Sequence, residues 1–357
     1  MYKGCRKGNG GEMMKKIYAK KIYVFCPAGV KTGGPELLHQ LVYALNQNKK
    51  SASIVYTGKI NHTYKIIDEY LQYIDSYLLP EEVEDSAENL VIVPETNVLA
   101  LKRFKNIQTA MWWLSVDNFY FRYLNLNALK LRFTNWGFLR TIKRSIFNSH
   151  TLLSMKSRLI KKIDFHLCQS QYAIEECKKY GYEAYYLSDY LNDQFFTEKT
   201  ETLVKENIVA YSPVKGFRFT RKIIDKNPGL NFFPIINMTR AEVQNLLKKS
   251  KVYIDFGNHP GMDRIPREAR MQGCVVITGK NGSAKYTEDV PIEEKFERKT
   301  CNIKAISNLI KDIFDNYEKW NEKQMNYTDF IKGQKERFFK DVKSIFDCEN
   351  RDIHYFH

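Results

Sequence analysis

Apolar residues along the chain occur in short runs that alternate with helical patterns. The run at 21–27, KIYVFCP, is apolar, β-branched and aromatic and stops at a proline, which predicts a strand. The next segment, 35–47, carries its apolar residues on one helical face: Leu37, Leu38, Leu41, Val42 and Leu45. Further strands are predicted at 51–58, 89–94, 109–115, 165–170 and 183–189, and the last two flank a helix that ends at Gly181.

A polar stretch at 197–207 interrupts this alternation, and we interpret it as a linker. After it, strands are predicted at 207–213, 231–237, 251–257 and 274–279, with helices at 240–250 and 304–314. Strands alternating with helices imply parallel sheets covered on both faces. We therefore expect an α/β protein with two Rossmann-like domains. The expected parts are a disordered leader at 1–20, a first domain at 21–200, a second domain at 201–320, and a C-terminal helical segment at 321–357 that packs back on the first domain.

The cysteines and the N-terminus indicate the compartment. The seven cysteines are widely spaced and form no C-x-x-C, so they fit neither a disulfide framework nor a zinc site. No run approaches the ~18–20 apolar residues that a membrane span needs. The basic leader is not followed by an apolar region, so it is not a secretory signal. These features predict a soluble protein in the reducing cytoplasm.

Basic residues are concentrated in one stretch of the chain. The formal net charge of +15 favours acidic partners such as phosphates, nucleic acid or an anionic membrane. Residues 118–163 include ten basic and no acidic residues, with aromatic residues among them. Within this stretch, 138–147 has the pattern of a basic amphipathic helix at a membrane interface. A nucleic-acid-binding surface and a helix whose apolar face packs in the core are the alternatives.

The first candidate site is the turn Gly33-Gly34-Pro35-Glu36, between the first strand and the first helix. Ligands of open α/β sheets bind at the carboxyl ends of strands. Glycines there let the backbone approach a phosphate, and the helix N-terminus supplies N–H donors. We predict that Gly33 and Gly34 bind the ligand, and an ordinary glycine turn is the alternative. The turn is not G-x-G-x-x-G, which argues against a dinucleotide dehydrogenase.

The densest polar run, at 255–278, directly follows an apolar strand. Carboxylates in such a loop can accept hydrogen bonds from ribose hydroxyls, and guanidinium groups can pair with phosphate. The predicted ligand-binding residues here are Asp263, Arg264, Arg267 and Glu268. A solvated loop with local salt bridges is the alternative.

A third motif, Ser212-Pro213-Val214-Lys215-Gly216, follows the first strand of the second series. Lys215 is predicted to be a phosphate ligand because it lies at a strand end, and Arg221 follows close behind. The alternative is a solvated lysine, which is the commoner state of a lysine in a loop.

In their order and spacing, these motifs resemble the GT-B glycosyltransferases of the retaining family 4 (glycosyl transferases group 1) of bacterial capsule and lipopolysaccharide biosynthesis. The family's G-G-x-E turn matches Gly33 to Glu36, and its S-P-x-K-G pattern matches Ser212 to Gly216. Its E-x7-E region is matched by Gly257, Pro266, Glu268, Ala269, Gly273, Val275 and Ile277. The similarity extends from residue 21 to about 313. It implies the GT-B fold, with parallel sheets facing a central cleft, and sugar transfer from a nucleotide-sugar.

Two positions depart from the family pattern. The family's first carboxylate falls on Pro260 and its phosphate-binding arginine on Ala210, so Arg264, Arg267 or Arg221 would have to supply that charge. The sequence has no D-x-D motif, so a metal-bridged diphosphate is not expected. A cation-independent enzyme relies on basic side chains and helix dipoles to stabilise the leaving diphosphate. We predict no metal and no cofactor, with a UDP- or GDP-linked sugar as co-substrate.

Two residues are candidates for catalysis. Asp117 follows the strand at 109–115, where the family often carries acceptor-side residues, so it is a candidate base or acceptor-positioning group. An N-cap of the next helix is the alternative for Asp117. His259 lies in the densest polar loop, although a lone loop histidine is more often a bystander.

The sequence as a whole predicts a metal-independent, retaining glycosyltransferase. Its acceptor is expected to be a glycan or a lipid-linked glycan of surface polysaccharide biosynthesis. The basic stretch 118–163 would then place the protein peripherally on the inner, anionic face of the plasma membrane. A nucleic-acid partner is not expected. A basic nucleic-acid-binding protein and a GT-B sugar-nucleotide epimerase stay open as alternatives.

Overall fold

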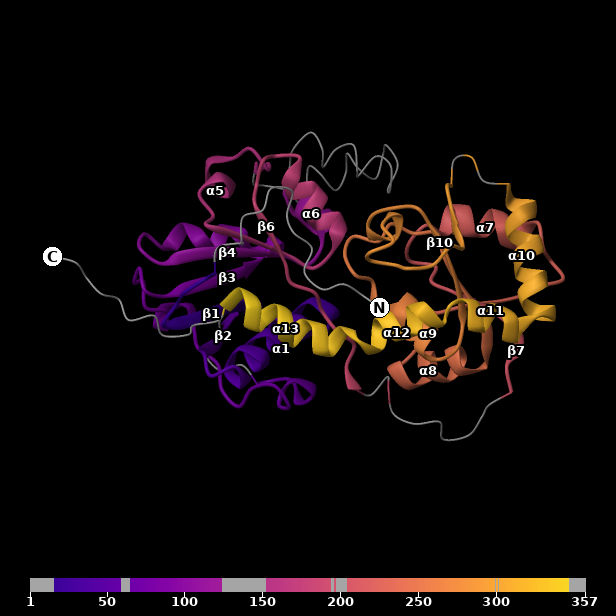
Figure 1. The fold of residues 1–357 in the computed structure, drawn as a ribbon, viewed down its shortest axis with the longest axis horizontal. Helices are drawn as coiled ribbons and strands as arrows, with labels where there is room; N and C mark the ends of the chain where they lie inside the picture. Colours follow the sequence, from indigo (N-terminus) through magenta and orange to yellow (C-terminus); the bar gives the residue numbers. More distant parts are fainter. Residues whose placement is uncertain are drawn as a thin grey trace.

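The computed structural model describes residues 16–58, 65–123, 152–193, 196, 204–298, 300 and 302–346. Within these residues the chain forms two parallel sheets, each with its own helices, that lie next to each other along the longest axis of the molecule (Figure 1). None of the helices in this part of the chain combines the length and the apolar character needed to cross a membrane.

The first sheet has six strands in the order β2-β1-β3-β4-β5-β6. These are β1 (Lys21–Pro27), β2 (Ser51–Thr57), β3 (Leu90–Pro94), β4 (Gln108–Trp113), β5 (Phe165–Cys168) and β6 (Ala184–Tyr186). Its α-helices are α1 (Gly33–Gln47), α2 (Val116–Arg122), α5 (Arg158–Lys161) and α6 (Gln171–Lys178). Short 3₁₀ segments are η1 (Asp68–Tyr70), η2 (Pro80–Glu82) and η3 (Glu95–Arg103).

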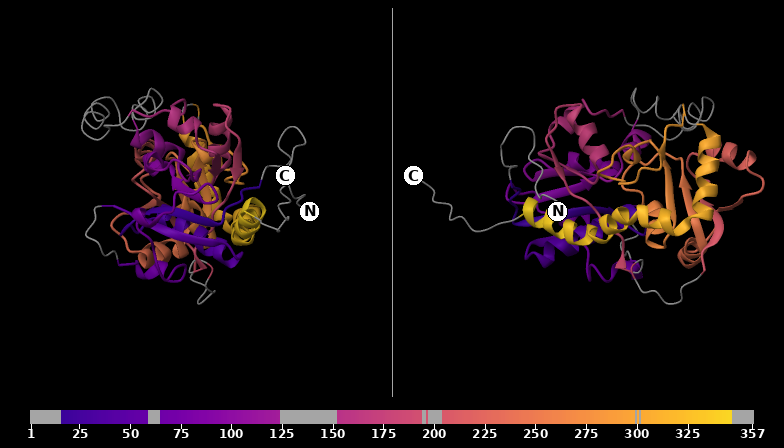
Figure 2. Two further views of the ribbon diagram at one scale, coloured as in Figure 1. Left: turned by 90° about the vertical axis from the view of Figure 1, so that its left-hand side faces the viewer. Right: turned by 45° about the vertical axis from the view of Figure 1, so that its right-hand side comes forward.

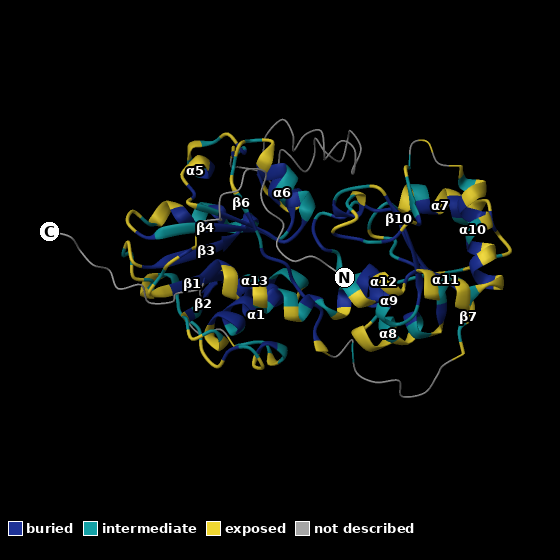
Figure 3. Ribbon diagram, viewed as in Figure 1, coloured by how far each residue is buried: buried dark blue, intermediate teal, exposed yellow. Residues whose placement is uncertain are grey.

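The strands of the first sheet are apolar on both faces because helices cover both. Successive side chains of a strand point to opposite faces, so Val24 of β1 packs in one core and Phe25 in the other. The adjacent Trp112 and Trp113 of β4 are divided between the two cores in the same way. Figure 3 shows the result, with buried strands and helices exposed on their outer sides.

The second sheet has five strands in the order β11-β10-β9-β7-β8. These are β7 (Glu206–Tyr211), β8 (Asn231–Pro234), β9 (Ser250–Asp255), β10 (Val275–Gly279) and β11 (Lys295–Phe296). The accompanying helices are α7 (Phe217–Asp225), α8 (Arg240–Lys249), α9 (Arg264–Met271), α10 (Ile303–Asp315), α11 (Tyr317–Lys323), α12 (Met325–Lys332) and the short η5 (Ser283–Lys285).

The last helix, α13 (Gln334–Phe346), returns to the first domain (Figure 2). Ile331 of α12 packs in the core of the second sheet, whereas Phe338 and Phe346 of α13 are buried in the core beside α1. Part of the predicted leader also packs here, because Ile17 is buried and its N–H donates to the carbonyl of Ile345 (2.9 Å). Residues 1–15 lie outside the described residues.

The basic stretch 118–163 is described only at its two ends. Residues 124–151, which include the predicted amphipathic helix at 138–147, lie outside the described residues. At the described ends, Phe119 and Ile160 are buried in the core of the first sheet. The cations there are exposed: Arg122, Lys156, Arg158, Lys161 and Lys162. In the described part, most apolar positions of this stretch are buried or half-buried, Leu152 is exposed, and the charges face outward.

Candidate functional site

The loop that follows β9 lies directly on the first domain. The N–H of Val116, at the start of α2, donates to the carbonyl of Pro260 (2.9 Å). Gly261 is so close to β4 that a Cβ there would lie 2.1 Å from the carbonyl oxygen of Leu114, so only glycine fits. The polar run after β9 therefore reaches the carboxyl end of β4, where Asp117 lies.

Asp117 is buried in this contact, on the first turn of α2. Its Oδ1 accepts a hydrogen bond from the Tyr172 hydroxyl (3.1 Å), and its Oδ2 accepts one from the side-chain amide of Asn258. The N-cap of α2 is Ser115, whose hydroxyl accepts a first-turn N–H (3.1 Å), so Asp117 does not cap the helix. Burial raises the pKa of Asp117 to about 6, although Tyr172 and Lys215 act in the opposite direction. The carboxylate is thus ionised near neutral pH and close to its titration, as suits a general base.

A second cluster surrounds Lys215, in the loop between β7 and α7. Its ammonium pairs with both carboxylate oxygens of Asp263 (2.9 and 3.1 Å). His259 is buried between two carboxylates, with Nε2 3.6 Å from Asp255 Oδ1 and Nδ1 3.7 Å from Asp263 Oδ2. Among the described residues neither ring nitrogen has a hydrogen-bond partner. Burial disfavours the imidazolium, but Asp255 and Asp263 outweigh burial and raise the pKa of His259.

Close backbone packing brings Lys215 to this position. Gly216 has a φ of +67°, a conformation that glycine adopts readily. A Cβ at Gly216 would lie 2.4 Å from the carbonyl oxygen of Phe256, at the end of β9. The loops after β7 and β9 therefore touch through their backbones, which sets Lys215 beside Asp263.

The Asp255–His259–Asp263 group contains metal-ligand types, and one ligand atom from each residue lies within 4.8 Å of the others. The spacing of these residues along the chain had not suggested such a group. The two carboxylates face different nitrogens of the same ring, however, and Lys215 already neutralises Asp263. A metal site needs ligand atoms that converge on one point at about 2.0–2.2 Å. The geometry is that of an ion network around an imidazole.

A third group joins the first helix to α9. Arg264 forms an ion pair with Glu36 of α1, and its Nε lies 3.3 Å from Glu268 Oε1. Arg240 of α8 lies 3.7 Å from the same Glu36 carboxylate. A Cβ at Gly33 would lie 3.1 Å from Cδ of Arg264, so the glycine turn and the arginine are in contact. The G-G-x-E turn and the polar run, two motifs about 230 residues apart in the sequence, meet at this point.

Burial and charge act against each other in this third group. Burial raises the pKa of Glu268, although Arg264 and Arg267 act in the opposite direction. Burial disfavours the Arg264 guanidinium, but Glu36 and Glu268 outweigh it and raise the pKa of Arg264. At Gly34, the other predicted glycine, a Cβ would lie 3.8 Å from a methyl carbon of Leu114, which is an ordinary contact distance.

Two of the predicted ligand-binding arginines lie elsewhere. The Arg267 side chain is only 1% exposed and forms a bidentate ion pair with Asp189, in which its two terminal nitrogens donate to the two carboxylate oxygens (3.0 and 2.6 Å). It also donates to Gln334 (2.9 Å), so its contacts hold α9 to the first domain and to α13. Arg221 is exposed on α7, 3.8 Å from Asp225 of the same helix. The structure therefore gives Arg267 a structural role and places Arg221 on the outside of its helix.

Sequence reasoning did not single out several residues of the interface. Glu36 belonged to the recognised G-G-x-E turn, and Asp255 opened the polar run, so the sequence did contain a signal for both. Nothing in the sequence indicates what Tyr172, Asp189 and Asp289 contact, and only the fold shows their partners.

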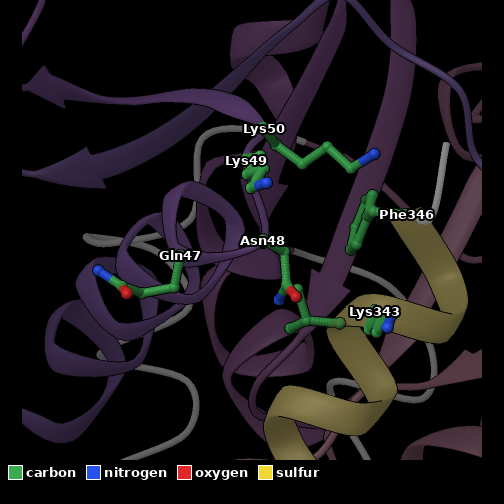
Figure 4. A pocket seen from close by; sticks show the side chains of 7 residues that line it. Gln47, Asn48, Lys49, Lys50, Lys343 and Phe346 are labelled. Carbon is green, nitrogen blue, oxygen red and sulfur yellow. The ribbon is translucent and has the colours of Figure 1, made fainter. Parts of the chain in front are cut away.

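A pocket of about 220 Å³ lies away from these clusters, between the end of α1 and α13 (Figure 4). Its lining is Gln47, Asn48, Lys49, Lys50, Val342, Lys343 and Phe346. Because Lys50 immediately precedes β2, the pocket lies at the amino edge of the sheet. Ligands of parallel α/β sheets bind at the opposite, carboxyl edge. The domain interface described above is therefore the candidate site.

No protein-family model matches this chain, and no curated protein sequence matches it. Solved structures with the same arrangement do match. HepE (Alr3699) from Anabaena, in complex with UDP-glucose, superposes with a TM-score of 0.56 at 10% identity, covering 90% of this chain and 98% of that one. Sucrose-phosphate synthase (tll1590) from Thermosynechococcus elongatus gives 0.55 at 12% identity, with 92% and 95% covered.

A TarM mutant from S. aureus, in complex with fondaparinux, alpha-GlcNAc-glycerol and UDP, gives a TM-score of 0.51 at 13% identity. The match covers 75% of this chain, which spans 57% of the TarM chain. Together with the sheet topology, these similarities confirm the predicted fold class: the chain has the α/β GT-B fold, with two parallel sheets.

Proposed function

We propose that this protein is a glycosyltransferase that takes its sugar from a UDP- or GDP-linked donor. One observation carries the proposal: the carboxyl edges of both sheets meet where Lys215 and Arg264 flank the N-terminus of α9. A helix N-terminus with two cations beside it suits a diphosphate. Asp263, the N-cap residue of α9, makes no side-chain cap and pairs with Lys215 instead. A donor diphosphate would replace Asp263 as the partner of Lys215.

The remaining residues of the interface have roles that suit the same reaction. Glu268 lies one turn into α9 and would accept hydrogen bonds from donor hydroxyls, as carboxylates do with ribose. Gly33 and Gly34 would let the donor approach the backbone of α1. We propose that Asp117 accepts a hydrogen bond from the acceptor hydroxyl and so positions it, on the basis of its burial, its pKa of about 6 and its place beside the polar loop.

We also propose that the transfer needs no metal and retains the anomeric configuration. The cations Lys215 and Arg264 would stabilise the leaving diphosphate in place of a metal ion. Retention rests on the resemblance to family 4 alone. An inverted product, identified by NMR of its anomeric proton, would instead make Asp117 the general base of a single displacement.

A thermal-shift panel of nucleoside diphosphates and their sugars tests the donor proposal. A ligand that binds only the native state raises the melting temperature by mass action. We expect UDP or GDP, and their sugars, to raise it, and the corresponding nucleosides to have little effect because they lack the diphosphate. A panel without any shift, together with no sugar transfer or epimerisation, would refute the proposal. Conversion of the donor sugar without an acceptor would identify an epimerase instead.

We further propose a glycan or lipid-linked glycan as acceptor, with the protein peripheral on the inner face of the plasma membrane. The described cations of 118–163 are exposed, and each basic residue near an anionic leaflet contributes about 1 kcal/mol to binding. Co-sedimentation with vesicles of varied anionic lipid content, at low and high salt, tests this. Binding that rises with anionic lipid and falls with salt is expected. Equal, negligible binding to anionic and neutral vesicles at low salt would refute the membrane proposal but not the transferase proposal.

A further inference from the structure

The segment after β10 holds the start of helix α6 in the first domain. Asp289 is fully buried, and its two carboxylate oxygens accept the backbone N–H groups of Gln171 (2.7 Å) and Tyr172 (3.1 Å). In the same segment, the ring of Tyr286 stacks on that of Tyr172, with centroids 6.3 Å apart and planes inclined by 26°. Tyr172 is therefore held by the second domain through both its backbone and its ring.

Tyr172 in turn holds one oxygen of Asp117, and Asn258 of the second domain holds the other. The two supports belong to one connected unit. The hydroxyl of Ser283 donates to the carbonyl of Gly261 (2.6 Å), which ties the segment carrying Asp289 to the loop carrying Asn258. Both partners that orient the Asp117 carboxylate thus depend on how the second domain sits on the first.

We infer that Asp289 is a positioning residue: by holding the first turn of α6, it keeps the Tyr172 hydroxyl on Asp117, so that the acceptor-side carboxylate is correctly oriented only while the two domains are docked. This inference rests on the proposed role of Asp117. It assigns Asp289, Tyr172 and Asn258 to the reaction, although none of them would touch the reacting atoms. Asp289 differs from a surface carboxylate because it is buried and both of its oxygens accept N–H groups from the first turn of α6, where a negative charge is stabilising.

The first test measures the pKa of Asp117 without any substrate, by NMR titration of protein labelled at the aspartate carboxyl carbons. The Asp117 signal is assigned by its loss in Asp117→Asn. Tyr172→Phe removes a hydrogen bond that favours the ionised form, so the Asp117 pKa should rise by about one unit. Asp289→Ala should raise it in the same direction. Combining the two changes should add nothing beyond Tyr172→Phe, because Asp289 acts through Tyr172.

Glu288→Ala, a change at the exposed neighbouring carboxylate, is the matched control and should leave the Asp117 signal in place. Asp289→Asn keeps one acceptor oxygen, so it should raise the Asp117 pKa less than Asp289→Ala does. If Asp289→Ala does not fold, Asp289→Asn replaces it in the test. An Asp117 pKa that is unmoved in both Asp289 variants, while Tyr172→Phe moves it, would overturn the inference. Shifts that add in the double variant would overturn it as well.

The second test uses sugar transfer by the full chain. Asp289→Ala should lower kcat several-fold with the donor KM nearly unchanged, and should move the acid limb of the pH profile upward as Tyr172→Phe does. A loss of stability alone would lower the amount of folded protein without moving that limb. A wild-type protein that transfers no sugar would count against the proposed function, and the NMR titration would still decide whether Asp289 positions Asp117.

Discussion

Two ion-pair clusters lie at the start of helix α9, one at its N-cap residue Asp263 and one four residues further along at Arg267, and they differ in burial and in hydrogen bonding. Around Arg267, all three guanidinium nitrogens donate hydrogen bonds, the Asp189 partner is equally buried, and each of these side chains is 1% exposed. Around Lys215, the lysine side chain is 41% exposed and neither ring nitrogen of His259 has a hydrogen-bond partner in the described residues. Lys215 and His259 both lie beside Asp263, and His259 also lies beside Asp255.

The difference in burial and hydrogen bonding indicates which of the two clusters stabilises the fold and which is free to bind a ligand. A buried arginine with complete, planar hydrogen bonding has nothing left to offer a ligand, and breaking such a pair is costly. A partly exposed lysine that pairs with a neighbouring carboxylate can instead pair with a phosphate group of a bound ligand. Perturbed, incompletely satisfied groups of this kind gather at functional sites. These contacts give Arg267 a structural role, whereas Lys215 is the residue that we propose as the ligand contact.

The largest expected effect is on stability. Arg267→Ala leaves Asp189 buried without a partner, and removing one member of a buried pair costs about 3–5 kcal/mol. Urea unfolding should show this loss in the free energy of unfolding. The control Arg221→Ala, at an exposed arginine of α7, should stay within about 0.5 kcal/mol of the wild type. A stable Arg267→Ala protein with weakened donor binding would reverse the comparison.

The next effect is on donor binding. Lys215→Ala and Glu268→Ala each remove a charge-assisted hydrogen bond, worth about 1.5–3 kcal/mol, so nucleoside diphosphate affinity or donor use should fall roughly tenfold or more. Calorimetric titration with the diphosphate that gives the largest thermal shift measures this for Lys215. The fold should stay intact, as seen by circular dichroism. Lys222→Ala, at an exposed lysine of α7, is the matched control; equal binding by Lys215→Ala and Lys222→Ala would exclude this site.

A smaller effect concerns pH. Two carboxylates raise the folded-state pKa of His259 above its ordinary 6.5, so its contribution to stability is fully present below pH 6.5 and is lost as the pH rises through the folded value. Melting temperatures between pH 6 and 9 should therefore fall more steeply for the wild type than for His259→Gln. Parallel curves for the two proteins would show that His259 is neutral in the fold.

The smallest expected effect is that of a chelator. If Lys215 and Arg264 supply the positive charge, sugar transfer should be unchanged by EDTA. The measurement is the initial rate after dialysis against EDTA, with and without added magnesium or manganese. If EDTA abolishes activity and either metal restores it, the Asp255–His259–Asp263 group would have to be reinterpreted as a metal centre.

The fold could be predicted from the sequence because its strands are buried on both faces. Such strands are continuous apolar runs, so 21–27 and 274–279 were recognisable, and the structure places β1 at Lys21–Pro27 and β10 at Val275–Gly279. The two-residue β11, Lys295–Phe296, was missed because so short a strand has no periodicity to detect. Predicted strands such as 231–237 ran past the observed ends, since apolar residues continue into the following loop; β8 ends at Pro234.

The candidate site was predictable only where residues follow strand ends. Parallel strands bring their carboxyl ends to one edge, so Lys215, Asp263 and Asp117 could be expected near a ligand. Pairings across the domain interface could not, because nothing local in the sequence links Arg267 to Asp189 or Tyr172 to Asp289. The motif that contained both Arg264 and Arg267 gave no means of telling which of them would be buried.

The return of α13 to the first domain has a consequence for how the protein is made. Phe338 and Phe346 complete the core beside α1, yet they are translated after the whole second domain. Domains usually fold in order as the chain leaves the ribosome, at about 5–20 residues per second. Here the first sheet must wait with one apolar face partly uncovered until its last helix has been synthesised. The nascent chain therefore carries an exposed surface for chaperones to cover throughout the translation of the second half.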